Sequence, residues 1–210
     1  MENIVTLYGP AFSSYVRSAR LCCEEKGVGY TLQERITKAD WAMLKSPFQK
    51  VPILKHGDFI LFESAAICRY IDRTFDGPPL SPTHPQELAR MDQWISAANC
   101  YFDPAFIRHF VLEYAFPKTA DGKPDQEKIN AALPDVHKQL GVANEALKDR
   151  DYFSGTGAGI ADYLIIPMID YLARGTTGAG IFNDYPKVAE YLARMEERQS
   201  CQKILVAPQI

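Results

Sequence analysis

Two serines stand where a hydroxyl group can act on an anion. Ser13 follows a short run of β-forming residues and precedes an amphipathic segment, and Ser64 begins a later segment whose apolar residues recur at helical spacing. A serine at a helix start commonly caps the helix with its side chain. The unpaired amides and the helix dipole at the same place favour a bound anion. The residues alone favour a plain cap at Ser13, while Ser64 can cap and bind at once.

The cysteines suggest neither a redox pair nor a metal site. Their number is odd, and no two are spaced as Cys-x-x-Cys or in a zinc-binding pattern. We interpret them as reduced thiols that act as small core residues, which predicts a reducing compartment such as the cytoplasm and no bound metal. They are Cys22, Cys23, Cys68, Cys100 and Cys201.

Composition excludes several classes of protein. The chain has 210 residues, 47% of them hydrophobic, and a formal net charge of -3. No basic stripe is present, so we expect no nucleic-acid partner. No apolar run reaches the ~18 residues of a membrane span, and the first residues do not resemble a secretory signal.

The first third of the chain predicts alternating strands and helices. The expected order is strand, helix, strand, then a short helix, a two-stranded hairpin and a further helix. Gly27 is expected to end the first helix. The strands are expected at 4–8, 30–32, 51–54 and 59–62, and the helices at 14–26, at 39–44 and from Ser64 to Phe75.

The rest of the chain predicts helices alone. Five glycines and prolines between Asp76 and Pro85 mark a linker. Beyond it, apolar residues recur at helical spacing in four segments, and residues 160–173 are apolar on nearly every face, as in a buried central helix. We therefore predict an α+β protein with a small α/β domain at residues 1–76, a linker at 77–85 and an all-helical domain at 86–210.

Several motifs, in register along essentially the whole chain, resemble those of the glutathione transferase superfamily. They are most similar to the serine-type members, and among these to the phi class. The resemblance implies a thioredoxin-like N-terminal domain (βαβ-α-ββ-α) followed by an all-α bundle. In chain order the motifs are Tyr8–Ser13, Ser46–Pro52, Leu61–Ile67, Tyr101–Ala105, and Tyr152–Gly155 with Ile160–Asp162.

The resemblance implies that Ser13 stabilises the thiolate of glutathione. A free thiol has a pKa of about 8.5, so a hydroxyl donor and a helix dipole are needed to favour the anion at neutral pH. Tyr8 is the rival, because tyrosine-type members carry a phenol at the end of the same strand. Tyr8 is otherwise an aromatic packed at a strand end, and we favour Ser13. Arg17, one turn further along the helix, stays outside this assignment.

The resemblance also implies the contacts of the tripeptide. The Val51–Pro52 turn is similar to the cis-proline turn whose valine backbone pairs with the cysteinyl part of glutathione. Glu63 is expected to accept from the ligand's ammonium group, and Ser64 with the nearby amides to bind a carboxylate. Lys38 and Lys50 are weaker candidates for the glycyl carboxylate.

A pocket for a hydrophobic second substrate is expected between the two domains. Its candidates are aromatic, and a stripe of this kind is as readily explained as core packing. They are Phe12, Phe106, Phe110 and Tyr114.

One position departs from the family pattern. The buried helix is expected to begin after Gly159, where the family has serine or threonine, with Asp162 three residues later. Glycine lacks the side-chain cap, but Asp162 can still accept from the cap amide.

The resemblance implies an enzyme, a cytoplasmic glutathione S-transferase that acts in detoxification. It would conjugate glutathione to hydrophobic electrophiles and also reduce peroxides. Glutathione is a co-substrate, no other cofactor is implied, and a homodimer is expected with one subunit's first domain against its partner's second. The alternatives are a non-enzymatic binding protein and a thiol-disulfide reductase of the same superfamily, which would carry cysteine in place of Ser13.

Overall fold

The computed structural model describes residues 4–175 and 178–206, and these form two compact units. The first unit runs to Ser81 and also includes helix α10 (Gln199–Ile204), and the second is Pro82–Arg198. The second unit thus ends earlier than the helical domain expected at 86–210. Helix α10 packs against α1 (Ser14–Lys26) of the first unit, where Lys203 Nζ lies 2.8 Å from Glu24 Oε2 and Ser200 Oγ donates to Glu25.

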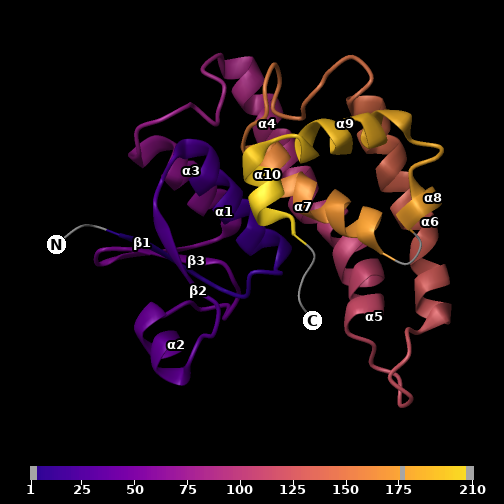
Figure 1. Ribbon diagram of the computed structural model, residues 1–210, viewed down its shortest axis with the longest axis horizontal. Helices are drawn as coiled ribbons and strands as arrows, with labels where there is room; N and C mark the ends of the chain where they lie inside the picture. The colour runs from indigo at the N-terminus through magenta and orange to yellow at the C-terminus, as the bar shows by residue number, and fades with distance from the viewer. Residues whose placement is uncertain (1–3, 176–177, 207–210) are drawn as a thin grey trace. The chain divides into compact units, whose positions relative to one another are not determined.

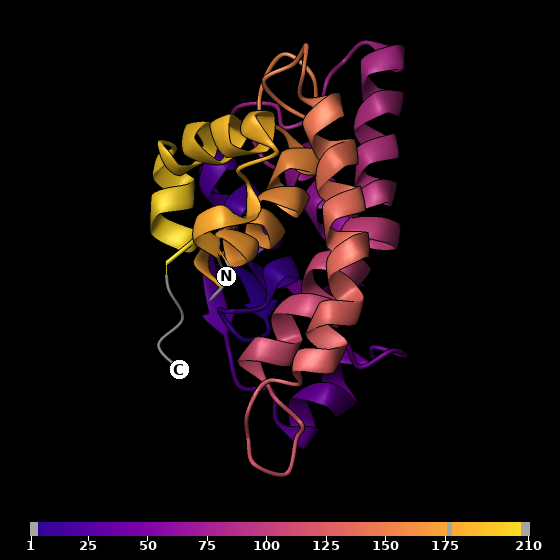
Figure 2. The same cartoon turned by 90° about the vertical axis from the view of Figure 1, so that its right-hand side faces the viewer.

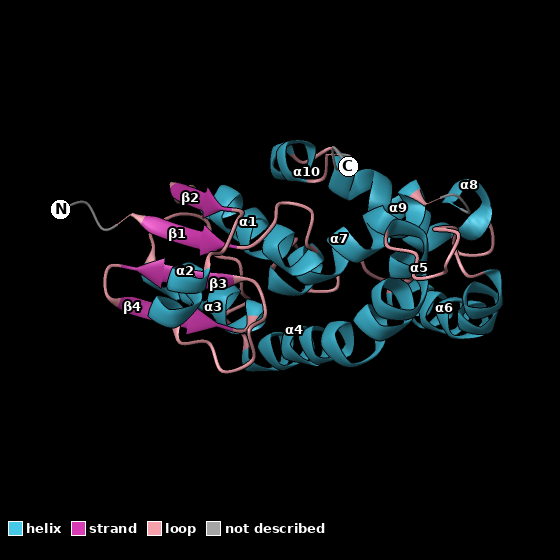
Figure 3. Cartoon of the chain, turned by 90° about the horizontal axis from the view of Figure 1, so that it is seen from below, coloured by secondary structure: helices cyan, strands magenta, loops and turns pink. Residues whose placement is uncertain are grey.

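The first unit is built on a four-stranded mixed sheet in the order β2-β1-β3-β4 (Figure 3). Strand β2 runs parallel to β1, as a helical crossover between them requires, while β3 and β4 form an antiparallel hairpin. The four strands are β1 (Val5–Tyr8), β2 (Tyr30–Gln33), β3 (Ile53–His56) and β4 (Phe59–Phe62).

Helices cover both faces of this sheet (Figure 1). Helices α1 and α3 (Ser64–Thr74) pack together on one face, and α2 (Lys38–Leu44) lies by the other. Helix α1 ends at Gly27 as predicted, because the left-handed φ of 74° lets its N–H bond the carbonyls of Cys23 and Glu24. The α+β class and the order of elements predicted for this unit are confirmed.

The second unit is helical in its described part. A π-helical segment, η1 (Ala98–Val111), continues α4 and contains Pro104. Its wider turns suit a proline, which lacks the amide that an α-helix would use. Figure 2 shows η1 running beside α6. The remaining helices are α4 (Pro85–Ala97), α5 (Leu112–Ala115), α6 (Gln126–Ala146), α7 (Ile160–Arg174), α8 (Gly178–Ile181) and α9 (Pro186–Glu196).

Helix α7 is the buried centre of the second unit, as its apolar sequence predicts. Every residue from Ile160 to Asp170 is buried. The carboxylate of Asp162 accepts from the amides of Gly159 at 3.0 Å, Phe153 at 2.8 Å and Ser154 at 3.1 Å. Burial raises the pKa of Asp162, and these amide bonds oppose the shift. The bond from the cap amide to Asp162 is thus confirmed.

None of the helices in the described part of the chain is long and apolar enough to cross a membrane.

Candidate functional site

The candidate site is built at one end of the sheet of the first unit, where β1 and β4 end and β3 begins. In the sheet register Tyr8 lies opposite Ile53, and Ile53 lies opposite Phe62. The residues just beyond this row are Gly9, Pro52 and Glu63. The loops that follow β1, precede β3 and follow β4 therefore meet at the same end of the sheet. The motifs around Ser13, Val51 and Ser64, which are far apart in the sequence, are brought together in this way.

Gly9 allows two of these loops to touch. Its φ of 138° is in a region that side chains disfavour, and a Cβ there would lie 2.6 Å from Val16 Cγ2 and 2.8 Å from Val51 Cβ. A glycine after a strand commonly serves to end it. The structure shows that it also permits close packing of the β1–α1 loop against the valine of the Val51–Pro52 turn.

Ser13 is the N-cap residue of α1, but its side chain makes no cap hydrogen bond. Its backbone is extended, with φ -66° and ψ 127°, and its amide donates to the Pro10 carbonyl at 3.0 Å. The residue is half-buried. A hydroxyl in this position can donate to an anion at the positive end of the α1 dipole.

Tyr8 is packed into the face of the sheet that α2 covers. It is 8% exposed and belongs to a buried cluster with Leu44 and Ile53, against which Trp41 also packs. Burial, and then the negative charge of Asp40, raise the pKa of Tyr8. A neighbouring carboxylate also disfavours a thiolate, so this environment supports the packing interpretation of Tyr8.

The Val51–Pro52 peptide bond is cis, as in the turn that the resemblance implies. Strand β3 begins at Ile53, two residues later than the predicted start at Val51, because Pro52 has no amide to donate to the ladder. The ladder to β1 ends at the Tyr8–Ile53 pair. The backbone of Val51 therefore lies beyond the sheet pairing, at its open end.

Glu63, and not Ser64, is the N-cap residue of α3, which corrects the sequence expectation. Glu63 has φ 70° and ψ 113°, its side chain makes no cap hydrogen bond, and it is exposed. Ser64 is the first helical residue and is 7% exposed. A non-glycine residue at positive φ costs about 1–3 kcal/mol and persists where the surroundings require it, often at a binding site.

The two candidate lysines are both exposed. Lys38 is the first residue of α2, whose start is fixed by a reciprocal capping box between Thr37 and Asp40. Lys50 lies in the loop between α2 and β3, next to Val51. Both side chains can attract an anionic ligand to this part of the first unit.

The four aromatic candidates differ in burial. Phe12 is 44% exposed, beside Ser13 in the first unit. Phe106 and Phe110 are 0% and 2% exposed in the second unit, where Phe106 stacks on Phe102 with ring centroids 5.2 Å apart. These two pack in the core, as the alternative interpretation predicts. Tyr114, half-buried, contacts Phe110 edge to face.

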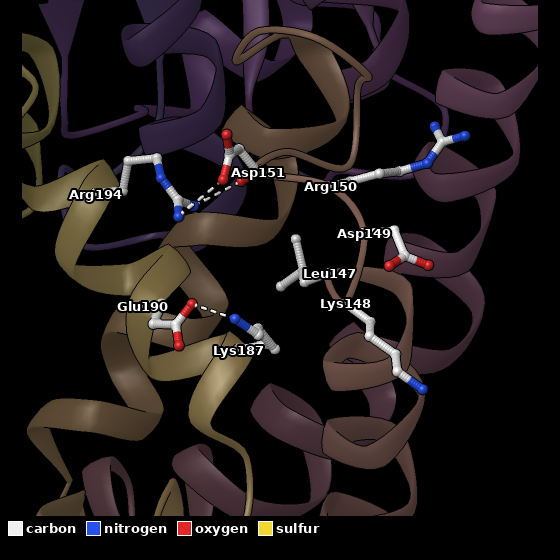
Figure 4. A pocket seen from close by; sticks show the side chains of 8 residues that line it. All are labelled: Leu147, Lys148, Asp149, Arg150, Asp151, Lys187, Glu190 and Arg194. Atoms are coloured by element: carbon white, nitrogen blue, oxygen red, sulfur yellow. Dashed lines mark hydrogen bonds and ion pairs between the residues drawn. The ribbon is translucent and has the colours of Figure 1, made fainter.

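A separate pocket of about 160 Å³ in the second unit is lined mostly by charged side chains (Figure 4). Arg194 lies 3.0 Å from Asp151, and Lys187 lies 2.7 Å from Glu190. Its other cations, Lys148 and Arg150, are also paired with carboxylates. The pocket therefore offers no unpaired cation to a ligand. The described residues contain no cluster of three or more potential metal ligands.

Comparison with known families decides the assignment. The glutathione S-transferase N-terminal domain family matches residues 7–79, and the glutathione S-transferase C-terminal domain family matches residues 95–199. This chain belongs to the glutathione S-transferase family. The N-terminal match contains Ser13, Val51 and Glu63, and the thioredoxin-like fold, the enzyme class and the transferase function expected from the sequence are confirmed.

Plant glutathione S-transferases of the phi class are among the similar proteins, which confirms that part of the resemblance. A rice protein named as probable glutathione S-transferase GSTF1 is 30% identical over 218 residues, covering 98% of both chains. Maize glutathione S-transferase I in complex with an atrazine glutathione conjugate is 28% identical, with 96% of each chain covered and a TM-score of 0.83. A theta class enzyme from Xanthomonas axonopodis pv. citri with glutathione bound is also 28% identical, covering 99% of this chain and 100% of that one, with a TM-score of 0.80.

Proposed function

We propose that the end of the sheet binds glutathione and that Ser13 stabilises its thiolate for attack on hydrophobic electrophiles. One observation carries the proposal. Ser13 stands at the N-cap of α1, yet its hydroxyl is not used to cap the helix. It also lies in the loop that the strand register brings beside Val51 and Glu63.

The chemistry needs an anion and a leaving group. The glutathione thiol releases its proton to solvent, and the Ser13 hydroxyl donates a hydrogen bond to the sulfur anion that remains. The positive end of the α1 dipole favours the same charge. The thiolate then forms a carbon–sulfur bond to the electrophile, and the bond to the leaving group breaks with its electron pair.

The other site residues would bind the tripeptide. Glu63 accepts from the ammonium group, and Ser64 with the first amides of α3 binds the neighbouring carboxylate. The backbone of Val51, beyond the last pair of the ladder, pairs with the cysteinyl part like an added strand. Lys38 and Lys50 attract the glycyl carboxylate.

The second substrate would be an apolar electrophile, in keeping with the atrazine conjugate found in the maize enzyme. Phe12 and Tyr114 keep open surface and remain candidates for contacting it. Phe106 and Phe110 would shape such a pocket only from behind, as core residues. The same thiolate would attack the terminal oxygen of a hydroperoxide, which breaks the O–O bond, releases the alcohol and leaves glutathione sulfenic acid. A second glutathione would convert this acid to glutathione disulfide and water, so peroxide reduction belongs to the proposal as a second activity.

A thiol-disulfide reductase is the weaker alternative. Cys22 and Cys23 are fully buried, and burial raises the pKa of both thiols. Thiols in such surroundings are poor nucleophiles. A non-enzymatic binding protein would use the same site without turnover, and only an activity measurement separates it from the enzyme.

The test is turnover of a chlorinated dinitrobenzene with glutathione by wild type, Ser13→Ala and Ser96→Ala. Loss of a hydrogen bond to a charged sulfur costs about 1.5–3 kcal/mol, so Ser13→Ala should lower kcat/KM about 10- to 150-fold. It should also raise the pKa of bound glutathione, so the loss should be greater at pH 6.5 than at pH 9. Ser96 is exposed on α4 and its change should leave both quantities unaltered. Absence of turnover by the wild type would support the binding-protein alternative.

We also propose that the protein is a cytoplasmic homodimer acting in detoxification. Phe48, in the first unit, is 61% exposed. The second unit has a pocket of about 320 Å³ whose apolar part is formed by Ala105, Ala131 and Ala132. An aromatic ring from a partner's first unit would fit such a pocket, which agrees with the expected pairing of first domain with second. Five free cysteines suit a reducing compartment.

Sedimentation tests the dimer. Phe48→Ala should shift the molar mass from that of two chains towards that of one. Phe59→Ala, which changes another exposed phenylalanine of the same unit, should remain dimeric. A wild-type mass equal to that of a single chain contradicts the proposal.

A further inference from the structure

Two backbone hydrogen bonds lie at the ends of the loop that carries Ser13. Between the end of β1 and the start of α1, the amide of Gly9 donates to the Gln33 carbonyl at 3.0 Å, and that of Ser13 donates to the Pro10 carbonyl at 3.0 Å. Pro10 has no amide, and Phe12 is 44% exposed. Burial therefore does little to determine where the middle of the loop lies.

Glu34 supplies an anchor in the middle of the loop. Its Oε2 atom accepts a hydrogen bond from the amide of Ala11 at 3.0 Å. Glu34 follows β2 directly, and the parallel register that places Gln33 beside Tyr8 carries the chain forward beside the loop. At Gly9 the partner is the backbone carbonyl of Gln33, and at Ala11 it is the side chain of the next residue, Glu34. A carboxylate is the stronger acceptor for such an amide.

We propose that Glu34 is a positioning residue for Ser13. The inference rests on the proposed function of Ser13 and adds a group that neither the motifs nor the family comparisons assign. By fixing Ala11, Glu34 restricts the two residues that lead to Ser13 and so sets the direction in which the Ser13 hydroxyl meets the sulfur.

A direct electrostatic role of Glu34 and a positioning role predict different results for the same substitutions, which permits a sharp test. Close to a thiolate a carboxylate disfavours the anion, so a direct electrostatic role predicts that Glu34→Gln improves thiolate formation. A positioning role predicts that Glu34→Gln retains function, because the amide oxygen of glutamine still accepts from Ala11. Only Glu34→Ala removes the acceptor.

The experiment compares wild type, Glu34→Ala, Glu34→Gln and Asp58→Ala, the last a control for an exposed carboxylate in the β3–β4 turn. Three measurements are made: amide exchange in the peptide covering residues 9–13, the ultraviolet titration of bound glutathione, and steady-state kinetics that give kcat and KM for glutathione. An exposed hydrogen bond of this kind is expected to change kcat about 2- to 10-fold.

In Glu34→Ala we expect faster exchange in the loop, a higher pKa for the bound thiol and a lower kcat, with KM for glutathione little changed. Glu34→Gln should restore all three, and Asp58→Ala should match the wild type. The inference is overturned if Glu34→Gln is as impaired as Glu34→Ala, if Glu34→Gln lowers the thiol pKa below the wild-type value, or if Glu34→Ala leaves the titration unchanged. A wild type that binds glutathione without turnover contradicts only the proposed function, because exchange and titration still decide the role of Glu34.

Discussion

The helices that begin at the candidate site start differently from the central helix of the second unit. The N-cap residues of α1 and α3 are Ser13 and Glu63, polar residues whose side chains make no cap hydrogen bond. At the start of α7, by contrast, the buried carboxylate of Asp162 accepts from three backbone amides. A polar side chain therefore accepts from backbone amides at the start of α7, whereas those of Ser13 and Glu63 make no such bond at α1 and α3.

If Ser13 and Glu63 bind glutathione as proposed, this difference separates polar residues that serve stability from those that serve binding. The first amides of a helix need partners from outside the helix. Asp162 accepts from the cap amide of Gly159 at α7 and also from two amides of the preceding loop. Thr37 and Asp125 accept from the amides of Asp40 in α2 and Lys128 in α6. At α1 and α3 the partner is expected to be the ligand. Changes at the two kinds of helix start should thus affect different measurements.

The largest effect is expected for Asp162→Ala. The change leaves three amides without their acceptor, two of them outside the helix, and should lower the free energy of unfolding by about 3–5 kcal/mol. Urea unfolding followed by circular dichroism measures it. Asp125→Ala, which removes an exposed cap bond and a surface ion pair with Lys128 from α6, is the control and should cost about 1 kcal/mol. Equal losses in the two variants would contradict the special role of Asp162.

Next in size is the effect of Glu63→Ala on glutathione binding. Loss of a charged acceptor should weaken binding by about 1.5–3 kcal/mol, or roughly 10- to 150-fold in Kd, measured by calorimetry. Asp76→Ala, which removes an exposed carboxylate after α3, should bind like the wild type. An unchanged Kd for Glu63→Ala would remove Glu63 from the site.

A smaller effect distinguishes two changes at the same residue. At the observed φ of 70°, alanine keeps the backbone strain and glycine relieves it. Glu63→Gly should therefore be more stable than Glu63→Ala by about 0.5–1 kcal/mol in urea unfolding, although both lose binding. In the interior of α2, by contrast, Ala42→Gly should lower the free energy of unfolding, because glycine there is less stable than alanine. If glycine is the less stable at position 63, the backbone there is not strained.

The smallest effect is expected for Tyr8→Phe, which removes the phenol oxygen and keeps the ring in its cluster. The titration of bound glutathione should be the same as in the wild type between pH 6 and 9. The raised pKa of Tyr8 means that the folded state holds the phenol proton more tightly than the unfolded chain does. Wild-type stability should therefore fall relative to Tyr8→Phe only as the pH rises above about 10. A shifted thiol titration in Tyr8→Phe, with none in Ser13→Ala, would indicate a tyrosine-type enzyme.

Features with a local physical cause could be predicted from the sequence. Gly27 ends α1 because a glycine after a helix adopts positive φ readily, and the apolar run from Ile160 marked the buried helix α7. The motifs around Ser13, Val51 and Glu63 lie at one end of the sheet, because the strand pattern that predicted the sheet also fixes which loops meet.

Features that depend on distant partners could not be predicted. The helical pattern begins equally well at Glu63 or Ser64, and only the backbone conformation shows that Glu63 is the cap residue. The contact between Glu34 and Ala11 joins residues 23 positions apart, and no local pattern marks it. The amphipathic spacing of Phe106 and Phe110 could not tell a core stripe from a pocket, because both have the same period.

The return of α10 to the first unit has a consequence for how the chain is made. The strands and helices of the first unit leave the ribosome early, but the helix that covers α1 is made only after the second unit, separated from Ser81 by more than a hundred residues. At ordinary rates of synthesis this delay is roughly 10 s. During that interval the residues of α1 that later meet Ser200 and Lys203 stay uncovered. A nascent chain stopped before Gln199 should accordingly be more easily cut by protease within its first unit than the finished protein.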